Sequence, residues 1–341
     1  MILVDADVLG RNRTGEETYV LNLLRQLPQV APDLRFAAMT RHPELVPAGV
    51  EAIELPARSQ ELRMAWTLPR LLRRLRPQLA HFQHALPLGY RGRSVVTLHD
   101  LHFEHDPSVM GLADRVTFKL VVPRAAKRAN HVLAVSERTK ADAIELYDLD
   151  PAKVTVTPHG VDPAFTPGGS PQGYLLFVGA VQERKNPLAA ADAADAAGLP
   201  LVVAGPEKEP QLARALRDRG VDVRGWVAKD ELASLYRGAE ALVLPSRFEG
   251  FGLPVLEAMA SGTPVVCSND LALREVGGDA AVYAVDGDFA AAVSRALSDR
   301  ESHAAAGRGG GGRLDARRLP AAAALDARGA RRLRRGLPSL R

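Results

Sequence analysis

Apolar and polar residues alternate along the chain as short apolar runs separated by longer stretches with helical periodicity. Short runs rich in Val, Ile, Leu and Ala are typical of strands that are buried on both faces. They lie near residues 1–5, 34–39, 51–55, 79–82, 94–98, 131–135, 153–157, 174–179, 200–204, 221–224, 240–245 and 263–267. This alternation predicts an α/β fold in which helices cover parallel sheets on both faces.

A segment rich in proline and glycine, residues 157–171, interrupts this alternation near the middle of the chain. Such segments are typical of linkers, and 341 residues are enough for two domains. We therefore expect two Rossmann-like domains, residues 1–165 and 166–307, with their sheets facing each other across a cleft. Residues 308–341 have a different composition and form a separate tail.

Residues 249–257 place two glutamates, Glu249 and Glu257, on either side of a turn that leads into a helix. Pro254 favours the first turn of a helix, and the glycines allow close approach of a ligand. The turn directs backbone N–H groups and a positive helix end at an anion such as a diphosphate. These N–H groups belong to Gly250, Phe251, Gly252 and Leu253. Together the features suggest a nucleotide sugar, although such turns are also common without a ligand.

Two further polar segments follow expected strands. The strand near 174–179 leads into a loop with the basic pair Arg184 and Lys185, and the strand near 94–98 leads into His99 and Asp100. Ligands of open α/β sheets bind at the carboxyl ends of strands. Guanidinium and ammonium groups suit phosphate oxygens, and a histidine can bind a sugar hydroxyl or transfer a proton. A solvated charge pair and a histidine that is satisfied within its loop remain alternatives.

These segments together resemble the retaining glycosyltransferases of the GT-B fold, specifically family 4 and its bacterial mannosyltransferase-like group. The resemblance implies that Glu249 lies near the donor sugar and that Glu257 binds the nucleotide ribose. It also implies that Arg184 and Lys185 hold the donor diphosphate, and that His99 approaches the sugar at the reaction centre. His99 and Glu249 are therefore the candidate catalytic residues.

The same family has a glycine-rich loop after its first strand, which meets donor and acceptor. Gly15 matches its first glycine and is expected to contact the donor, but Glu16 and Glu17 follow it where relatives often show Thr-Gly-x-Gly. The family also has a Pro-Asn/His-Gly-Val-Asp segment at its hinge, which residues 158–162 match. The loss of the second glycine weakens the case for phosphate binding by this loop.

The resemblance implies retaining transfer of a hexose, of the mannose or glucose type, from a GDP- or UDP-linked donor to a hydroxyl acceptor. The acceptor would be a glycan or a lipid-linked molecule in glycan, glycolipid or exopolysaccharide synthesis. No cofactor and no metal are expected, because cations and a helix end can stabilise the diphosphate. A catalytically impaired homologue and a sugar-nucleotide epimerase of the same fold remain alternatives. A dinucleotide oxidoreductase is disfavoured, because no Gly-x-Gly-x-x-Gly follows an expected strand.

Composition narrows the setting. The single cysteine, Cys267, excludes a disulfide within the chain and is too little for a structural metal site. The spacing of the histidines at 81, 84, 102 and 105 is not a zinc motif. The first residues lack the basic start and apolar core of a signal peptide, and no window of 18 apolar residues could span a bilayer. We therefore expect a cytoplasmic protein.

Basic residues gather in two places. Residues 308–341 contain ten arginines and two acidic residues, a net charge of +8, whereas the rest of the chain carries −4. We expect a disordered or frame-shifted tail there rather than a binding arm, and therefore no nucleic-acid partner. The stretch Arg63–Arg76 contains five arginines and Trp66. It resembles an interfacial helix that contacts the inner membrane face peripherally, although a surface helix over the first sheet is the alternative.

Overall fold

The computed structural model describes residues 1–11, 14–56, 62–106 and 111–310. The chain divides into two compact units, one spanning Met1–His159 and one beginning at Gly160. The division falls within the segment that was expected to link two domains. The tail beyond residue 310 lies outside the described residues.

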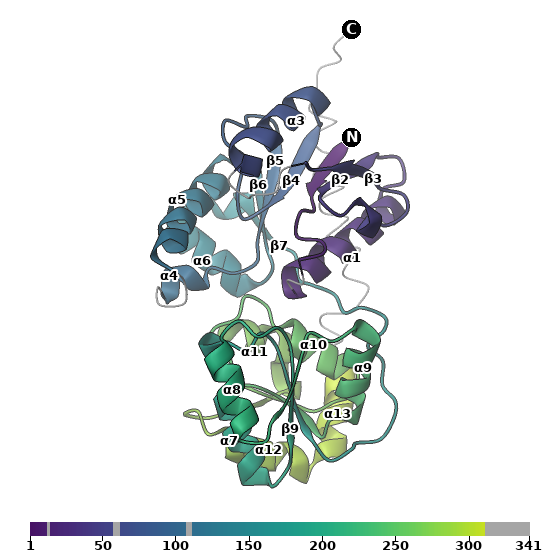
Figure 1. Cartoon of the computed structure of the whole chain (residues 1–341), viewed down its shortest axis with the longest axis vertical. Coiled ribbons are helices and arrows are strands. Elements are labelled where there is room, and N and C mark those ends of the chain that lie inside the picture. Colours follow the sequence, from purple (N-terminus) through teal and green to yellow (C-terminus); the bar gives the residue numbers. More distant parts are fainter. Residues whose placement is uncertain (12–13, 57–61, 107–110, 311–341) are drawn as a thin grey trace. The chain divides into compact units, whose positions relative to one another are not determined.

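The first unit contains a seven-stranded sheet in the order β3-β2-β1-β4-β5-β6-β7, and every neighbouring pair is parallel (Figure 1). Its central strands, such as Ile2–Asp5, are buried along their whole length, as expected for a sheet with two covered faces. The strands are β1 (Ile2–Asp5), β2 (Phe36–Thr40), β3 (Glu51–Glu54), β4 (Leu79–Gln83), β5 (Ser94–Leu98), β6 (His131–Ala134) and β7 (Val154–Val156).

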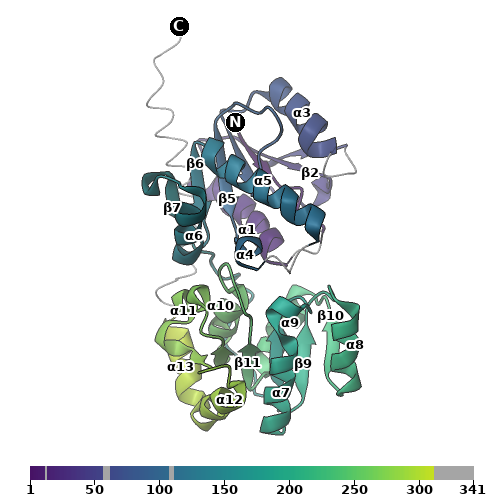
Figure 2. The same cartoon turned by 90° about the vertical axis from the view of Figure 1, so that its left-hand side faces the viewer.

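Helices cover both faces of this sheet. They are α1 (Thr14–Val30), α3 (Leu68–Leu75), α4 (His102–His105), α5 (Leu112–Arg128) and α6 (Glu137–Tyr147), with helical turns at Pro43–Leu45, Arg63–Thr67 and Pro151–Lys153. Helix α1 buries Leu23 and Leu24 against one face. Helices α3 and α5 share the core on the other face (Figure 2), where Leu68 and Ala126 meet alternate strand residues. The period-two alternation of strand side chains therefore supplies one core to each face.

The second unit contains a six-stranded sheet in the order β10-β9-β8-β11-β12-β13, again with parallel neighbours throughout. The strands are β8 (Leu175–Val178), β9 (Leu201–Ala204), β10 (Asp222–Gly225), β11 (Ala241–Leu244), β12 (Val265–Cys267) and β13 (Val282–Tyr283). Phe177 and Leu176 point to opposite faces of β8 and are both fully buried, so this sheet is covered on both faces too.

The helices of the second unit are α7 (Pro187–Ala197), α8 (Pro210–Asp218), α9 (Lys229–Gly238), α10 (Leu253–Ala260), α11 (Leu271–Gly277), α12 (Phe289–Ser298) and α13 (Arg300–Gly310), with turns at Glu183–Lys185 and Gly278–Ala280. Helices α7, α8 and α12 share one core with the sheet. Helix α10 contacts α9, α11 and α13. The alanines of α7 allow it to lie close to the sheet, and Gly198 ends it in the left-handed conformation.

The two parallel-sheet Rossmann-like domains expected from the sequence are confirmed. Each run that was expected to form a strand contains one, and β13 (Val282–Tyr283) is a further strand that was not predicted. The cleft expected between the domains stays a prediction. Among the described residues, none of the helices combines the length and apolar character needed to cross a bilayer.

Candidate active site

The strand order of each sheet places its ligand-binding edge. In the first sheet the order reverses between β1 and β4, and in the second between β8 and β11. At such a point the two following loops leave on opposite sides, which opens a crevice at the carboxyl ends of the strands. The segments predicted to bind the donor, residues 180–187 and 249–257, follow β8 and β11, the two strands that flank the reversal in the second sheet.

Lys185 and Glu249 meet at this point. The Lys185 Nζ lies 2.5 Å from Glu249 Oε1 and 2.6 Å from Oε2, although 64 positions separate the two residues. Only 6% of Glu249 is exposed. Burial alone would raise the pKa of Glu249, but the charges of Lys185 and Arg184 outweigh it and hold that pKa below its ordinary value. Glu249 is therefore an ionised carboxylate in a buried ion pair.

Arg184 belongs to the same network. Its Nη1 donates to the carbonyl oxygen of Phe248 and lies 4.0 Å from Glu249 Oε2. The backbone N–H of Arg247 donates in return to the Arg184 carbonyl at 2.9 Å, which ties the loop after β8 to the loop after β11. Two side chains predicted to bind the diphosphate are thus fixed beside the predicted catalytic glutamate.

The turn after Glu249 starts helix α10 as the sequence predicted. Gly252 has a φ of +106°, and a Cβ added there would meet Leu273 Cδ2 at 2.7 Å, so a glycine is needed at this position. Gly250 and Phe251 are buried, and Leu253 is the first residue of the helix. The first N–H groups of a helix have no partners within it and carry partial positive charge. The predicted anion-binding turn therefore has the expected backbone form.

Glu257 lies in the second turn of α10 and is buried. Its Oε2 accepts a hydrogen bond of 2.8 Å from the Tyr236 hydroxyl. Burial raises the pKa of Glu257 to about 7, an effect that the Tyr236 hydrogen bond only partly opposes. Glu257, the residue predicted to bind the ribose, therefore has a carboxyl group that is easily protonated near neutral pH.

Glycines bring three strand ends of the second sheet together. The N–H of Gly179 donates to Ala204 at 2.9 Å, and the N–H of Gly205 donates to Gly225 at 2.7 Å. A Cβ added to Gly205 would lie 2.0 Å from the Gly179 carbonyl oxygen, which leaves no room for a side chain. Sequence reasoning missed Gly205, although its position after an expected strand could have indicated it.

In the first unit His99 lies at the carboxyl end of β5, among other histidines. Its Nε2 lies 2.8 Å from Gln83 Oε1, within hydrogen-bond distance. The ring stacks on His159 at 6.1 Å and meets the edge of Tyr19 at 4.9 Å. Burial, reinforced by His84 and His159, holds the pKa of His99 well below its ordinary value. His99 is therefore neutral at physiological pH, which favours hydrogen bonding over proton transfer.

Glu16 and His84 lie near His99. Their potential ligand atoms and that of His99 all lie within 4.8 Å of one another, and this is the one such group of three among the described residues. Gly15, the glycine predicted to contact the donor, precedes Glu16 in the first turn of α1. His99 and Gly15 thus belong to the first unit, and the other eight predicted site residues belong to the second.

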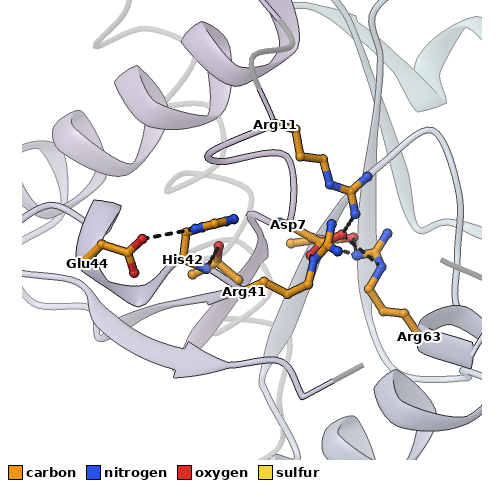
Figure 3. A network of polar contacts seen from close by, with 8 residues as sticks. Asp7, Arg11, Arg41, His42, Glu44 and Arg63 are labelled. Atoms are coloured by element: carbon orange, nitrogen blue, oxygen red, sulfur yellow. Dashed lines mark hydrogen bonds and ion pairs between the residues drawn. The ribbon is translucent and has the colours of Figure 1, made fainter. Parts of the chain in front are cut away.

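A charged network at the carboxyl end of β1 was not predicted. Asp7, 2% exposed, accepts from Arg41 Nε at 2.8 Å and from Arg11 (Figure 3). Arg63 donates to Asp5 at 2.8 Å and lies 3.3 Å from Asp7. Burial alone would lower the pKa of Arg63, but the two carboxylates outweigh it and raise that pKa. Acidic residues at the end of the first strand were the available signal.

Family comparisons agree with this architecture. Residues 13–165 match the model described as Glycosyltransferase Family 4, and residues 172–299 match the model described as Glycosyl transferases group 1. The chain therefore belongs to the glycosyltransferases, with a family 4 domain in its first half and a group 1 domain in its second.

Similar sequences include two bacterial mannosyltransferases. The chain is 30% identical to the O-antigen chain mannosyltransferase B of Escherichia coli over 60% of each chain. It is 27% identical to the O-antigen chain mannosyltransferase RfbU of Salmonella typhimurium over 83% of this chain and 86% of that protein. The match thus spans less than two thirds of the first relative and most of the second.

Solved structures show the same fold at low identity. The sucrose-phosphate synthase from Thermosynechococcus elongatus has a TM-score of 0.77 and 18% identity, over 98% of this chain and 99% of that one. Anabaena Alr3699/HepE in complex with UDP and glucose has a TM-score of 0.72 and 16% identity, over 96% and 99%. These neighbours support the GT-B fold that the sequence predicted.

Proposed function

We propose that the chain transfers a hexose, of the mannose or glucose type, from a GDP- or UDP-linked donor to a hydroxyl acceptor with retention at the anomeric carbon. The acceptor is a glycan or a lipid-linked molecule in glycan, glycolipid or exopolysaccharide synthesis. The similar mannosyltransferases and the UDP and glucose bound by Alr3699/HepE support this choice. The observation that carries it is the buried Lys185–Glu249 pair at the start of α10.

Departure of the nucleotide diphosphate is the step that this geometry assists. Negative charge grows on the diphosphate as the sugar leaves, and fixed cations in a buried site stabilise such charge strongly. The Lys185 ammonium has three N–H donors, so it can donate to Glu249 and to a phosphate oxygen at once. Arg184 and the N–H groups at the start of α10 add positive charge beside it.

The other site residues orient the donor in this proposal. Glu257 accepts hydrogen bonds from the ribose hydroxyls, as its place in α10 beside Tyr236 allows. The ionised Glu249 accepts hydrogen bonds from sugar hydroxyls, and the neutral His99 can accept or donate one. No covalent nucleophile is assigned.

We also propose that transfer needs no metal ion, because the cations Arg184 and Lys185 and the start of α10 would stabilise the diphosphate instead. Glu16, His84 and His99 form the group that could hold one. Removing metal with EDTA should leave the transfer rate unchanged, and added Zn²⁺ should not raise it. A rate that falls with EDTA and returns with one metal would contradict this, and loss of that response in His84→Ala would place the ion.

We place the reaction in the cytoplasm, where nucleotide sugars are made, and at the inner membrane face if the acceptor is lipid linked. Peripheral contact through the stretch Arg63–Arg76 would serve such an acceptor. Only four of the five arginines could take part in such a contact. Arg63 is buried against Asp5, whereas Arg70, Arg73, Arg74 and Arg76 are exposed.

Thermal shift with UDP, GDP, ADP and their sugar conjugates tests the proposal. One nucleotide should stabilise the protein, and Lys185→Ala should weaken its binding about 10- to 100-fold, because a charge-assisted contact is lost. Arg214→Ala removes an exposed cation of α8 and serves as the control. Transfer assays with the stabilising donor, read by NMR for the anomeric configuration, then test retention. Stabilisation without transfer or hydrolysis would instead identify a catalytically impaired homologue.

A further inference from the structure

We propose that α3 and the loop between β4 and β5 form a docking surface for an anionic lipid bilayer, with a headgroup phosphate held between Arg73, Arg76 and Arg91. This surface is called the α3 surface below. The inference deepens the membrane contact proposed above and does not depend on sugar transfer. Three features of the α3 surface support it: positive charge, exposed apolar side chains and a pocket.

The charge of the α3 surface has one sign. Residues 62–99 contain seven arginines and no acidic residue. Arg63 is turned inward to Asp5 and Asp7, so its charge is neutralised inside the domain. The exposed arginines of this stretch are Arg70, Arg73, Arg74, Arg76 and Arg91. Clusters of this kind are attracted to anionic lipid headgroups.

Large apolar side chains stand beside these arginines. Trp66 and Leu62 are each 62% exposed, and Leu88 is 72% exposed. The Leu88 N–H donates to the Met64 carbonyl at 3.0 Å, which fixes the tip of the β4–β5 loop against the turn that carries Trp66. Single exposed apolar residues are ordinary, but a group bordered by cations is typical of a surface that inserts shallowly into a bilayer.

A pocket of about 550 Å³ lies within the same surface. Its apolar wall comes from Pro69, Leu72, Leu88 and Tyr90, and its cations are Arg73, Arg76 and Arg91. None of the described residues that line it is acidic. Arg73 Nε donates to the Pro69 carbonyl at 3.1 Å, and Arg128 donates to the Tyr90 carbonyl at 2.9 Å, so both walls are held in place. Cations above an apolar wall suit a phosphate that is attached to a hydrocarbon chain.

The occupant that fits best is a lipid and not a nucleic acid. Both are anionic, and an exposed tryptophan could stack on a base. Here the Arg70 guanidinium already covers a face of the Trp66 ring. Exposed leucines also gain nothing from a nucleic acid, whereas the acyl region of a bilayer buries them.

Within the first unit, the pocket lies at the amino ends of β4 and β5, and His84 and His99 lie at their carboxyl ends. Arg76 lies three residues before β4 and Gly92 two residues before the parallel β5, whereas His84 and His99 directly follow these strands. Five residues of strand separate the two ends by roughly 16 Å. A lipid headgroup in the pocket therefore leaves the residues around His99 accessible to an acceptor.

Vesicle co-sedimentation of the full chain tests the inference. The protein should bind vesicles of phosphatidylcholine with 30% phosphatidylglycerol and should not bind phosphatidylcholine alone. The variant Arg73→Gln/Arg76→Asn/Arg91→Gln should bind about 100-fold more weakly, since each cation near an anionic surface contributes about fivefold. Asparagine is chosen at 76 because Arg76 has a φ of +45°, a conformation that asparagine tolerates. Trp66→Ser should weaken binding about tenfold.

A matched variant controls for total charge. The variant Arg25→Gln/Arg35→Gln/Arg214→Gln also removes three exposed arginines, one in α1, one directly before β2 and one in α8. It should keep vesicle binding. Both triple variants should keep the nucleotide-induced thermal shift, which separates this inference from the proposed function. Equal loss in the two triple variants would overturn the α3 surface, as would absence of vesicle binding by the natural sequence. Tighter binding to a 20-nucleotide single strand than to vesicles would replace the lipid with nucleic acid.

Discussion

At the scale of single residues, His99 is set apart by a pKa held well below its ordinary value of 6.5. Its imidazole therefore does not change charge between pH 6 and 8. We expect the profile of kcat/KM against pH to show no ionisation from His99 in that range, and we expect His99→Gln to lower kcat without changing the shape of the profile. An ionisation near pH 6.5 that disappears in His99→Gln would contradict this.

Glu257 has the opposite behaviour, because its pKa is raised to about 7 in the folded protein. The folded state then binds a proton more readily than the unfolded chain does. The free energy of unfolding should therefore fall as pH rises from about 4.5 to 7, by about 3 kcal/mol in total. Glu257→Gln keeps an acceptor for Tyr236 and should remove this fall, so the variant should be the more stable protein at pH 8.

Thermal denaturation of both proteins at pH 5 and pH 8 measures this difference. Without nucleotide, the stability gained by Glu257→Gln at pH 8 should shrink to about a quarter at pH 5. Glu183→Gln serves as the control, because it removes an exposed carboxylate from the turn after β8. A gain of the same size at both pH values would mean that ionisation of Glu257 is not its cause.

The chemistry of single residues could be predicted better than their contacts. Glycine-rich turns and basic pairs carry local signals, so Glu249, Glu257 and Lys185 could be selected from sequence. The contact between Lys185 and Glu249 joins positions 64 apart, and the contact between Arg63 and Asp5 joins positions 58 apart. Such pairings follow from strand order, which no local pattern encodes.

At the scale of elements, the start of α10 depends on Gly252. Gly252→Ala requires a left-handed backbone and also places Cβ 2.7 Å from Leu273, so we expect a loss of about 2–4 kcal/mol in stability. Gly198→Ala is the matched control, because its φ is +66° but no atom lies within 4 Å. It should cost only about 1 kcal/mol. Urea denaturation compares them, and equal losses would show that the steric contact is harmless.

Strands of this fold were predictable because burial on both faces makes them continuous apolar runs. Helix α7, with proline at its start and glycine after its end, carries both boundary signals as well. Strand β13 has only two residues, Val282 and Tyr283, and it was not predicted although the apolar run at residues 280–285 contains it. The stretch that carries Trp66 was expected as a helix interrupted at Pro69, and the structure gives residues Arg63–Thr67 π-helical form before α3 begins at Leu68.

At the scale of the whole molecule, each unit has its own hydrophobic core. We therefore expect two unfolding transitions in differential scanning calorimetry. The residues proposed to bind the nucleotide lie mainly in the second unit, so UDP or GDP should raise one transition. At 100 times its dissociation constant the ligand adds about 2.7 kcal/mol, or roughly 5–10 °C for a domain of this size. An equal rise of both transitions would contradict the assignment.

The contact of Gly205 with the Gly179 carbonyl matters to anyone who builds variant libraries to change donor preference. Randomising position 205 would mostly yield unfolded protein, because even the smallest side chain collides with backbone that cannot move aside. Screening effort is better spent on the loops after β8 and β11, where side chains rather than backbone occupy the space. The strand ends are therefore a rigid scaffold, and donor specificity has to be changed through the loops that follow them.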